Sequence, residues 1–328
     1  MRREQRGDPT SDSGFGGEKG VAFIMVLWVM ALLTILVTEF AYSMRTEVRA
    51  ARNFKEEAEA YYLALAGVNM AIAEILSEYD FNYPGEKSGV FFAKRDGTRM
   101  AFNREFPIGD GRVSYTIIDE ESKVNINVAS RGMIWDLLRV TGIEIETRDV
   151  IADSILDWRD VNQLSQLNGA EDDYYLKLPY PYEAKDGNLD TLEELLLVNG
   201  ITPEVFYGSD KVPPDLFYEE ERSAFSNEYA GMAQYATTTG SGLININTAS
   251  EKVLETRFGQ AVANQIIAQR QAGHFQTPSY GGIVKSTSFT ILSRGYAQNG
   301  PIYHEIKAII ERNTARPEIK IKYWNESI

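Results

Sequence analysis

One unbroken apolar run near the N-terminus constrains this 328-residue chain more than any other feature. It extends from Val21 to Thr38 without a charge, and Glu39 is the first charged residue after it. A run of about 18 residues lies near the lower limit for a helix that crosses the hydrocarbon core of a bilayer. No Gly or Pro follows before Gly67, so the run should continue into one long amphipathic helix.

The hydrophilic segment before this run differs from an ordinary secretory signal. Its basic residues are balanced by acidic ones, and residues 41–43 match a small-residue cleavage site poorly. A break directly before the apolar run, between Gly20 and Val21, is instead typical of type IV pilin-like proteins. A secretory signal peptide and a plain uncleaved membrane anchor remain as alternatives.

The fifth residue after that break is Met25, where pilin-like subunits usually carry Glu. In those subunits the Glu is thought to pair with the free amine of a neighbouring subunit. Because a charge buried in lipid is costly unless it is paired, a subunit without this Glu needs no subunit ahead of it. Met25 therefore favours a tip subunit over a bulk subunit of a filament.

The composition disfavours several other classes of protein. A formal charge of −14 disfavours nucleic-acid binding. The absence of Cys excludes disulfides, thiol catalysis and Cys-based zinc sites, and His274 and His304 are the only histidines. No nucleophile elbow, phosphate loop or His–carboxylate partner is present, so an enzyme is not expected.

The apolar pattern predicts an α+β fold, in which a helix over 22–77 packs on an antiparallel sheet. Apolar residues spaced by three and four from Val48 to Ile75 form the packing stripe. Breakers at 82–85 should end the helical region. Strands are predicted at 100–106, 112–119, 285–296, 302–311 and 318–324. Helical sequence fills most of the region between, so an α-helical domain should be inserted into a helix-plus-sheet domain that is split in sequence.

The predicted insert contains an internal repeat. Residues 124–130 read VNINVAS and residues 244–250 read ININTAS. Each copy ends in a Ser that can cap a following helix, with helix pairs predicted at 133–140 and 147–158, and at 252–257 and 260–271. Residues 187–191 and 273–277 continue the parallel. This is the outline of two helix-hairpin-helix, or SAM-like, repeats, with residues 207–241 between them read as a surface loop or linker.

An acidic segment in the first half of the insert is the densest polar feature of the chain. Its oxygen-bearing side chains suit a hard cation such as calcium, which takes six to eight oxygen ligands. The spacing is not that of an EF-hand, and a solvated acidic loop is the competing interpretation. The oxygen-bearing residues are Asp157, Asp160, Asn162, Asn168, Glu171, Asp172 and Asp173.

The hairpins also raise the possibility of a membrane-anchored DNA receptor, because such units can bind the phosphate backbone through paired glycines. Here the hairpins at 141–144 and 258–260 lack paired glycines. Glu144 and Glu146 beside the first hairpin would repel phosphate. A protein-interaction role is therefore preferred, with the DNA receptor as the alternative.

Taken together, the chain resembles the K-type minor pseudopilins of bacterial type II secretion systems. The resemblance extends from about Gly17 to the C-terminus. It rests on the Gly20/Val21 junction without Glu at the fifth position, on the two Asn-Ile-Asn-x-Ala-Ser repeats, and on residues 155–160, 168–175 and 192–203.

The resemblance implies five segments. They are a leader over 1–20, a transmembrane helix over 21–43, a pilin-like domain over 44–123, an inserted α-helical domain over 124–282, and the last pilin-like strands over 283–328. It also implies cleavage after Gly20 by prepilin peptidase, methylation of the Val21 amine, and a single-pass inner-membrane protein with its bulk in the periplasm.

The resemblance further implies the partners and the metal of the mature protein. The partners would be minor pseudopilins of the I and J types and the major pseudopilin, with secreted cargo as a further contact. The protein would cap and nucleate a filament used to export folded proteins. Calcium is implied in the α-domain, with Asp160, Asn162, Glu171 and Asp172 as its ligands.

Overall fold

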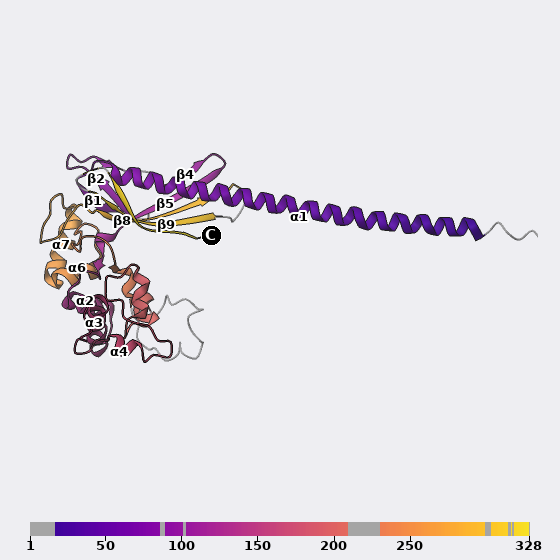
Figure 1. Cartoon of the computed structure of the whole chain (residues 1–328). Helices are drawn as coiled ribbons and strands as arrows, with labels where there is room; N and C mark the ends of the chain where they lie inside the picture. The colour runs from indigo at the N-terminus through magenta and orange to yellow at the C-terminus, as the bar shows by residue number, and fades with distance from the viewer. Residues whose placement is uncertain are drawn as a thin grey trace, which may run out of the picture. The chain divides into compact units, whose positions relative to one another are not determined.

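The computed structural model describes most of the chain. The described residues are 17–85, 89–100, 103–208, 230–298, 303–313, 316 and 318–327. Residues 1–16 of the predicted leader and 209–229 of the predicted linker lie outside them. The described part is an α+β structure, as predicted, with one long helix, an antiparallel sheet and further shorter helices (Figure 1).

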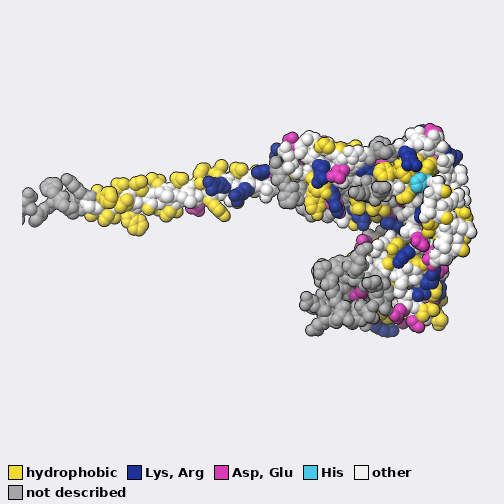
Figure 2. Space-filling view, turned by 180° about the vertical axis from the view of Figure 1, so that it is seen from behind, with side chains coloured by type: hydrophobic (Ala, Val, Ile, Leu, Met, Phe, Trp, Pro, Cys, Tyr) yellow, Lys and Arg dark blue, Asp and Glu magenta, His cyan; other side chains and the backbone are white. Residues whose placement is uncertain are grey.

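Helix α1 (Gly17–Leu76) is 60 residues long and covers nearly all of the predicted helix. Its part up to Ala58 belongs to a compact unit of its own. Within the described residues, α1 is the one helix long and apolar enough to cross a membrane, and none of its apolar window is buried. Figure 2 shows hydrophobic side chains along this part of the helix, followed by Lys and Arg. An apolar surface on all sides is what a membrane-spanning helix requires.

The second unit, Glu59–Ile328, contains the five-stranded sheet. Its strand order is β10-β9-β8-β5-β4, and all neighbouring pairs are antiparallel. Asp119 at the end of β5 pairs with Phe289 at the start of β8, so the helical region lies between two adjacent strands, as predicted. The strands are β4 (Glu105–Ile108), β5 (Gly111–Asp119), β8 (Ser288–Tyr296), β9 (Tyr303–Arg312) and β10 (Ile319–Ser327).

Small residues allow α1 and strand β8 to approach closely. A Cβ atom on Gly67 would lie 2.2 Å from Ser293 Oγ, and one on Gly295 would lie 2.1 Å from the Ala60 carbonyl oxygen. The Ser293 hydroxyl donates to the Ala64 carbonyl oxygen at 2.7 Å. The helix backbone therefore rests almost directly on the sheet.

The buried face of α1 follows the predicted stripe only in part: Val68 and Ile75 are buried, as predicted, but other positions differ. Ala60, Ala64 and Ala71 are buried, whereas the predicted Tyr61 and Ile72 are half-buried and flank the contact. The prediction gave large apolar side chains the central place. In the structure, small side chains occupy it because they permit the closest approach of backbone to backbone.

The helical region ends before residues 82–85, as predicted, but residues 82–84 also belong to a strand that was not predicted. Strand β1 (Phe81–Pro84) pairs with β2 (Val90–Ala93), and β2 pairs with β3 (Arg99–Met100). Pro84 is tolerated because β1 is an edge strand and Pro84 is its last residue. The predicted strand over 100–106 is likewise divided between β3 and β4.

The inserted region is built around two helix pairs. Ser130 caps α2 by accepting a hydrogen bond from the Met133 amide, and Ser250 caps α6 by accepting one from the Val253 amide, as predicted. The pairs are α2 (Arg131–Thr141) with α3 (Ile145–Arg159), and α6 (Glu251–Phe258) with α7 (Gln260–Ala272). The short elements are η1 (Glu120–Ser122), β6 (Val124–Asn125), α4 (Asp172–Tyr175), η2 (Leu192–Leu197), α5 (Pro203–Tyr207), η5 (Met232–Gln234) and β7 (Ala236–Thr237).

The repeated Asn residues make the same hydrogen bonds in both copies. The side-chain amide of Asn127 donates to the Leu189 carbonyl at 2.9 Å, and its oxygen accepts from the Leu189 amide at 2.8 Å. Asn247 makes the equivalent pair of bonds with Phe275, both at 2.8 Å. Each Asn side chain thus bonds to the backbone of a segment more than twenty residues away, as a neighbouring strand would.

An arginine near the end of the second helix completes each copy. Arg159 donates to the Ala129 carbonyl at 3.1 Å, and Arg270 donates to the Ala249 carbonyl at 2.7 Å. Both carbonyls belong to the turn that precedes the first helix. The sequence repeat therefore corresponds to a repeated hydrogen-bond network as well as to repeated helices.

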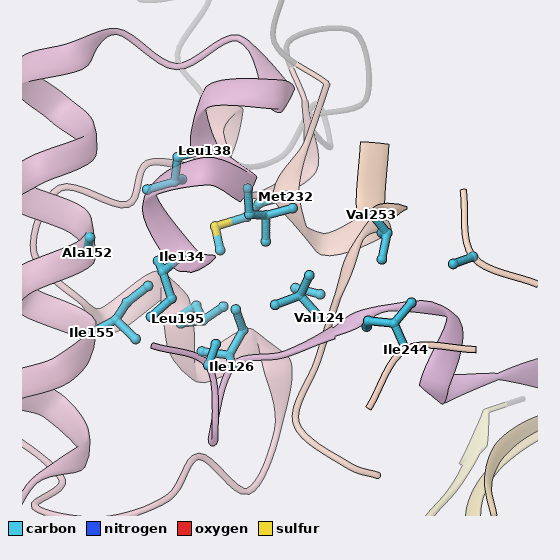
Figure 3. Close-up of a cluster of buried hydrophobic side chains, with 14 of the residues drawn as sticks. Val124, Ile126, Ile134, Leu138, Ala152, Ile155, Leu195, Met232, Ile244 and Val253 are labelled. Carbon is cyan, nitrogen blue, oxygen red and sulfur yellow. The ribbon is translucent and has the colours of Figure 1, made fainter. Parts of the chain in front are cut away.

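The two copies share one hydrophobic core (Figure 3). Val124 and Ile134 of the first copy and Ile244 of the second are fully buried in it, together with Met232. Met232 lies in η5, inside the segment interpreted as a surface linker. The end of that segment is therefore part of the core, and the interpretation is wrong there.

A buried carboxylate joins the sheet to the second copy. The Asp119 carboxylate at the end of β5 accepts hydrogen bonds from Asn245 at 3.1 Å, Thr248 at 2.6 Å and Ser286 at 2.7 Å. Its exposed fraction is only 3%. Burial raises the pKa of Asp119 to about 7, against the effect of the hydroxyl donors.

A buried ion pair ties α1 to the sheet. The Arg104 guanidinium donates to both carboxylate oxygens of Glu74, and to the Val90 carbonyl at 2.7 Å. The Tyr115 hydroxyl also donates to Glu74, at 3.2 Å. Both side chains of the pair are at most 2% exposed, so each charge depends on the other for compensation.

Candidate metal centre

Three carboxylates converge where helix α3 ends and helix α4 begins. Asp157 lies in the last turn of α3, and Asp160 is its C-cap. Glu171 is the residue directly before α4. Asp157 and Asp160 are three residues apart on a helix end, which places them on the same side. The loop 161–170 then returns the chain so that Glu171 faces them.

The geometry of this cluster suits a cation of calcium size. Oxygen atoms of Asp157, Asp160 and Glu171 all lie within 4.8 Å of one another. Calcium binds oxygen at about 2.3–2.6 Å, so two oxygens that share one ion lie up to about 5 Å apart. The three carboxylates therefore need no large movement to share an ion.

Two of the carboxylates are buried among other negative charges. Asp157 has an exposed fraction of 0% and Glu171 of 2%. Burial raises the pKa of Asp157 to about 6, against the effect of the Gln166 amide that donates to it. Burial, together with the charges of Asp157 and Asp160, raises the pKa of Glu171 to about 7. The folded state is therefore destabilised when these carboxylates are charged and no cation is bound.

Glu171 supplies the direct test of whether the residues fit a cation. Both of its carboxylate oxygens are buried and have no hydrogen-bond partner. A buried charged oxygen without a partner is costly. A cation between Glu171, Asp157 and Asp160 would provide the missing partner, so the residues fit a hard metal ion.

Glycine at position 169 lets the loop backbone approach Asp157 closely. A Cβ atom on Gly169 would lie 1.8 Å from Asp157 Oδ2. The Gln166 amide donates to both Asp157 oxygens, at 3.1 and 3.0 Å. Gly169 therefore allows the loop to close over the carboxylate.

The four predicted metal ligands are only partly brought together. Asp160 and Glu171 lie in the cluster with Asp157, which the predicted set omitted. Asn162 donates to Asp160 Oδ1 through its backbone amide at 2.9 Å and also through its side-chain amide. Asp172 accepts from the Ala184 amide at 2.7 Å, outside the three-carboxylate group. The helical spacing between Asp157 and Asp160 was the available signal for Asp157.

The predicted processing residues lie within α1. Gly20 and Val21 are both helical and exposed. A Cβ atom on Gly20 would meet no atom within 4 Å. Glycine at this position is therefore not required by packing within the chain.

Without a bound cation, the wild-type chain should lose stability relative to Glu171→Gln as the pH rises. Glu171 has a folded-state pKa of about 7 against a usual value of 4.5, so the folded state binds more protons between these values. This stabilising contribution is complete below about pH 4 and is lost as the pH rises through about 7. We expect a relative change in the free energy of unfolding of about 2–3 kcal/mol. Urea unfolding of both full chains in micelles with chelator, from pH 4 to 8, measures it, and parallel pH profiles would contradict it.

Comparison with known proteins places this centre inside a recognised domain. A family model described as "Type II secretion system (T2SS), protein K" matches residues 117–208, which include the three carboxylates. The Type II secretion system protein K of Pectobacterium carotovorum subsp. carotovorum is 26% identical over 209 residues, or 58% of this chain and 60% of that protein. The protein of the same name from Pseudomonas aeruginosa is 29% identical over 196 residues, or 56% and 57%. The matches thus span less than two thirds of each relative.

A solved structure shares the fold over more of the chain. It is a chain from the crystal structure of the GspK-GspI-GspJ complex of the enterotoxigenic Escherichia coli Type 2 Secretion System. The TM-score is 0.58 at 16% sequence identity, and the match covers 85% of this chain and 99% of that chain. The arrangement of long helix, sheet and inserted helices is therefore one already seen in a secretion-system protein.

Proposed function

We propose that this chain is a member of the type II secretion system protein K family and, on that premise, a minor pseudopilin. The observation that carries the proposal is the joining of three parts in one chain. They are a single candidate membrane span, a helix packed on a split antiparallel sheet, and a repeat-bearing insert between β5 and β8. The proposed role in export is structural.

We propose that the protein occupies the tip of the filament. Met25 places an uncharged side chain where a filament subunit would carry the Glu that pairs with the subunit ahead. The tip is the position at which no subunit lies ahead. The related fold in a complex named GspK-GspI-GspJ supports assembly with minor pseudopilins of the I and J types. We propose that the major pseudopilin follows them in the filament.

The same proposal states where the mature chain begins. Prepilin peptidase would cut between Gly20 and Val21 and leave a methylated Val21 amine. The exposed apolar surface of α1 after this point would hold the protein in the inner membrane until assembly, with the bulk of the chain in the periplasm. Both residues are exposed, so the junction is accessible within this chain.

Intact-mass measurement of the membrane-extracted full chain tests this assignment. We expect a chain that begins at N-methylated Val21 when prepilin peptidase is present, and the uncut leader when it is absent. The matched I- and J-type subunits should co-purify with the processed form. A start at Met1 both with and without prepilin peptidase would indicate a plain anchor. A start after Ser43 would indicate a signal peptide. Either result would contradict the proposal.

We also propose that the carboxylate cluster holds calcium in a structural role. Asp157, Asp160 and Glu171 would bind the ion, with Asn162 and Asp172 as the further predicted ligands. Calcium would supply positive charge to a buried site and no step of a reaction. Its effect would be to fix the end of α3, the loop and the start of α4 relative to one another.

A further inference from the structure

We propose that the loop between α3 and α4 is a docking surface for a partner-protein segment that carries apolar side chains flanked by Lys or Arg. The surface, called here the apolar loop, consists of Val161, Leu164 and Leu167. It lies beside the carboxylate cluster but is made by different side chains. The proposal concerns a surface of the insert and does not depend on calcium or on the assignment to secretion.

The apolar loop is exposed to an unusual degree. Val161 is 83% exposed, Leu164 is 78% exposed and Leu167 is 96% exposed. Single exposed apolar side chains are common on proteins, whereas grouped ones mark interaction sites. Their exposure costs stability that a partner could recover by covering them.

The loop is held in this conformation by its own polar groups. The Leu164 amide donates to Asn162 Oδ1 at 2.9 Å, and the Asn168 amide donates to Asp153 Oδ2 at 3.2 Å. The Gln163 side chain donates to Asp186, with its shortest contact at 3.0 Å. The polar residues thus form hydrogen bonds within the insert, while the apolar side chains between them are exposed to solvent. A loop ordered in advance loses less entropy on binding.

Negative charge surrounds the base of the loop. Oxygen atoms of Asp157, Asp160 and Glu171 lie within 4.8 Å of one another, Asp172 follows Glu171 in sequence, and Asp186 accepts hydrogen bonds from Gln163 of the loop. One divalent cation would leave most of this charge uncompensated. The charge that complements this surface is therefore positive, with or without calcium.

The nearby lysines do not cancel this field. Lys177 pairs with Asp173 at 3.4 Å, and Lys185 pairs with both Asp190 and Glu194 at 2.7 Å. An anionic lipid surface would meet net repulsion here. A protein segment with apolar and basic residues is the occupant that both the exposed side chains and the charge favour.

Peptide binding to the full chain in phosphatidylcholine nanodiscs tests the proposal. The probe is a fluorescein-labelled peptide of alternating Lys and Leu, and the matched probe replaces each Lys by Glu. We expect micromolar binding of the Lys peptide by fluorescence anisotropy, above that of empty nanodiscs, and at least tenfold weaker binding of the Glu peptide. The double variant Leu164→Ser/Leu167→Ser should weaken binding of the Lys peptide at least tenfold, both in calcium and in chelator.

Matched variants separate docking from folding. Leu243→Ser removes another exposed leucine, 43% exposed and outside the apolar loop, and should bind within twofold of wild type. Leu164→Lys keeps an aliphatic stem but adds a positive charge that repels the Lys peptide. It should weaken binding of that peptide as much as the double variant does, and it replaces the double variant in the test if the latter folds poorly. Equal binding of the Lys peptide by wild type and both loop variants would overturn the proposal. So would equal binding of the two peptides, or a loop-dependent co-flotation with phosphatidylglycerol vesicles in place of peptide binding.

Discussion

Calcium should raise the thermal midpoint of the wild-type chain and leave that of Glu171→Gln nearly unchanged. A ligand that binds only the folded state at a hundred times its dissociation constant stabilises it by about 2.7 kcal/mol. Glu171 brings to the site two buried carboxylate oxygens that have no hydrogen-bond partner. Its replacement by Gln removes the negative charge that a cation would compensate there. Differential scanning fluorimetry of the full chain in micelles, with calcium or with chelator, measures both effects.

The state without calcium provides a second readout. Glu171→Gln removes a buried negative charge, so at pH 8 in chelator the variant should be at least as stable as wild type. Glu183→Gln is the matched control, because Glu183 is exposed and lies outside the carboxylate cluster; it should keep the full calcium response. An equal response to calcium in wild type and Glu171→Gln would remove the cluster as the binding site.

Glu74→Leu should destabilise the helix–sheet unit by about 3–5 kcal/mol, the usual cost of removing one member of a buried ion pair. The variant leaves the Arg104 charge in a position where it is at most 2% exposed. A neutral partner such as the Val90 carbonyl cannot neutralise that charge. Urea unfolding of the full chain in micelles, followed by intrinsic fluorescence, measures the loss.

Two further variants distinguish lost charge compensation from lost packing. Glu74→Leu/Arg104→Met removes both charges and should recover most of the loss, because no buried charge remains. Glu105→Leu breaks the pair with Arg112, whose side chains are 59% and 52% exposed, and should cost less than about 1 kcal/mol. A double variant as unstable as the single one would show that shape, not charge, dominates at this position.

Much of the fold could be predicted because its strongest signals are local. The apolar run, the Ser130 and Ser250 caps, and the Gly-rich turn before β5 each act within a few residues. The duplicated Asn motif added a longer-range signal, and its two copies make equivalent hydrogen bonds. The domain boundaries drawn from these signals stay predictions.

The missed features depend on contacts between distant segments. Pro84 reads as a breaker until its place at the end of an edge strand is known. Gly67 gains its packing role only from Ser293. Met232 is isolated in sequence but reaches the shared core, because the surrounding segment is anchored by tertiary contacts that periodicity does not reveal.

The candidate site, too, could be predicted only where its signals are local in sequence. Composition located the acidic segment, and Asp160 and Glu171 lie in the carboxylate cluster. Choosing among its many oxygens required the path of the loop, which turns Asp172 toward the Ala184 amide and leaves Asp157 facing Glu171. Whether Asn162 and Asp172 contact an ion stays a prediction.

The pairing of Asp119 with Phe289 also dictates an order of events in folding. Strands β5 and β8 meet only after the whole insert has been synthesised, and closing so long a loop of flexible chain is entropically unfavourable. An insert that has already folded brings the two strand ends together and shortens the effective loop. Until β8, β9 and β10 emerge at the end of synthesis, the buried face of α1 lacks three of the five strands of that sheet. During that interval, the second half of the long helix is the part of the chain most in need of a membrane surface or a chaperone.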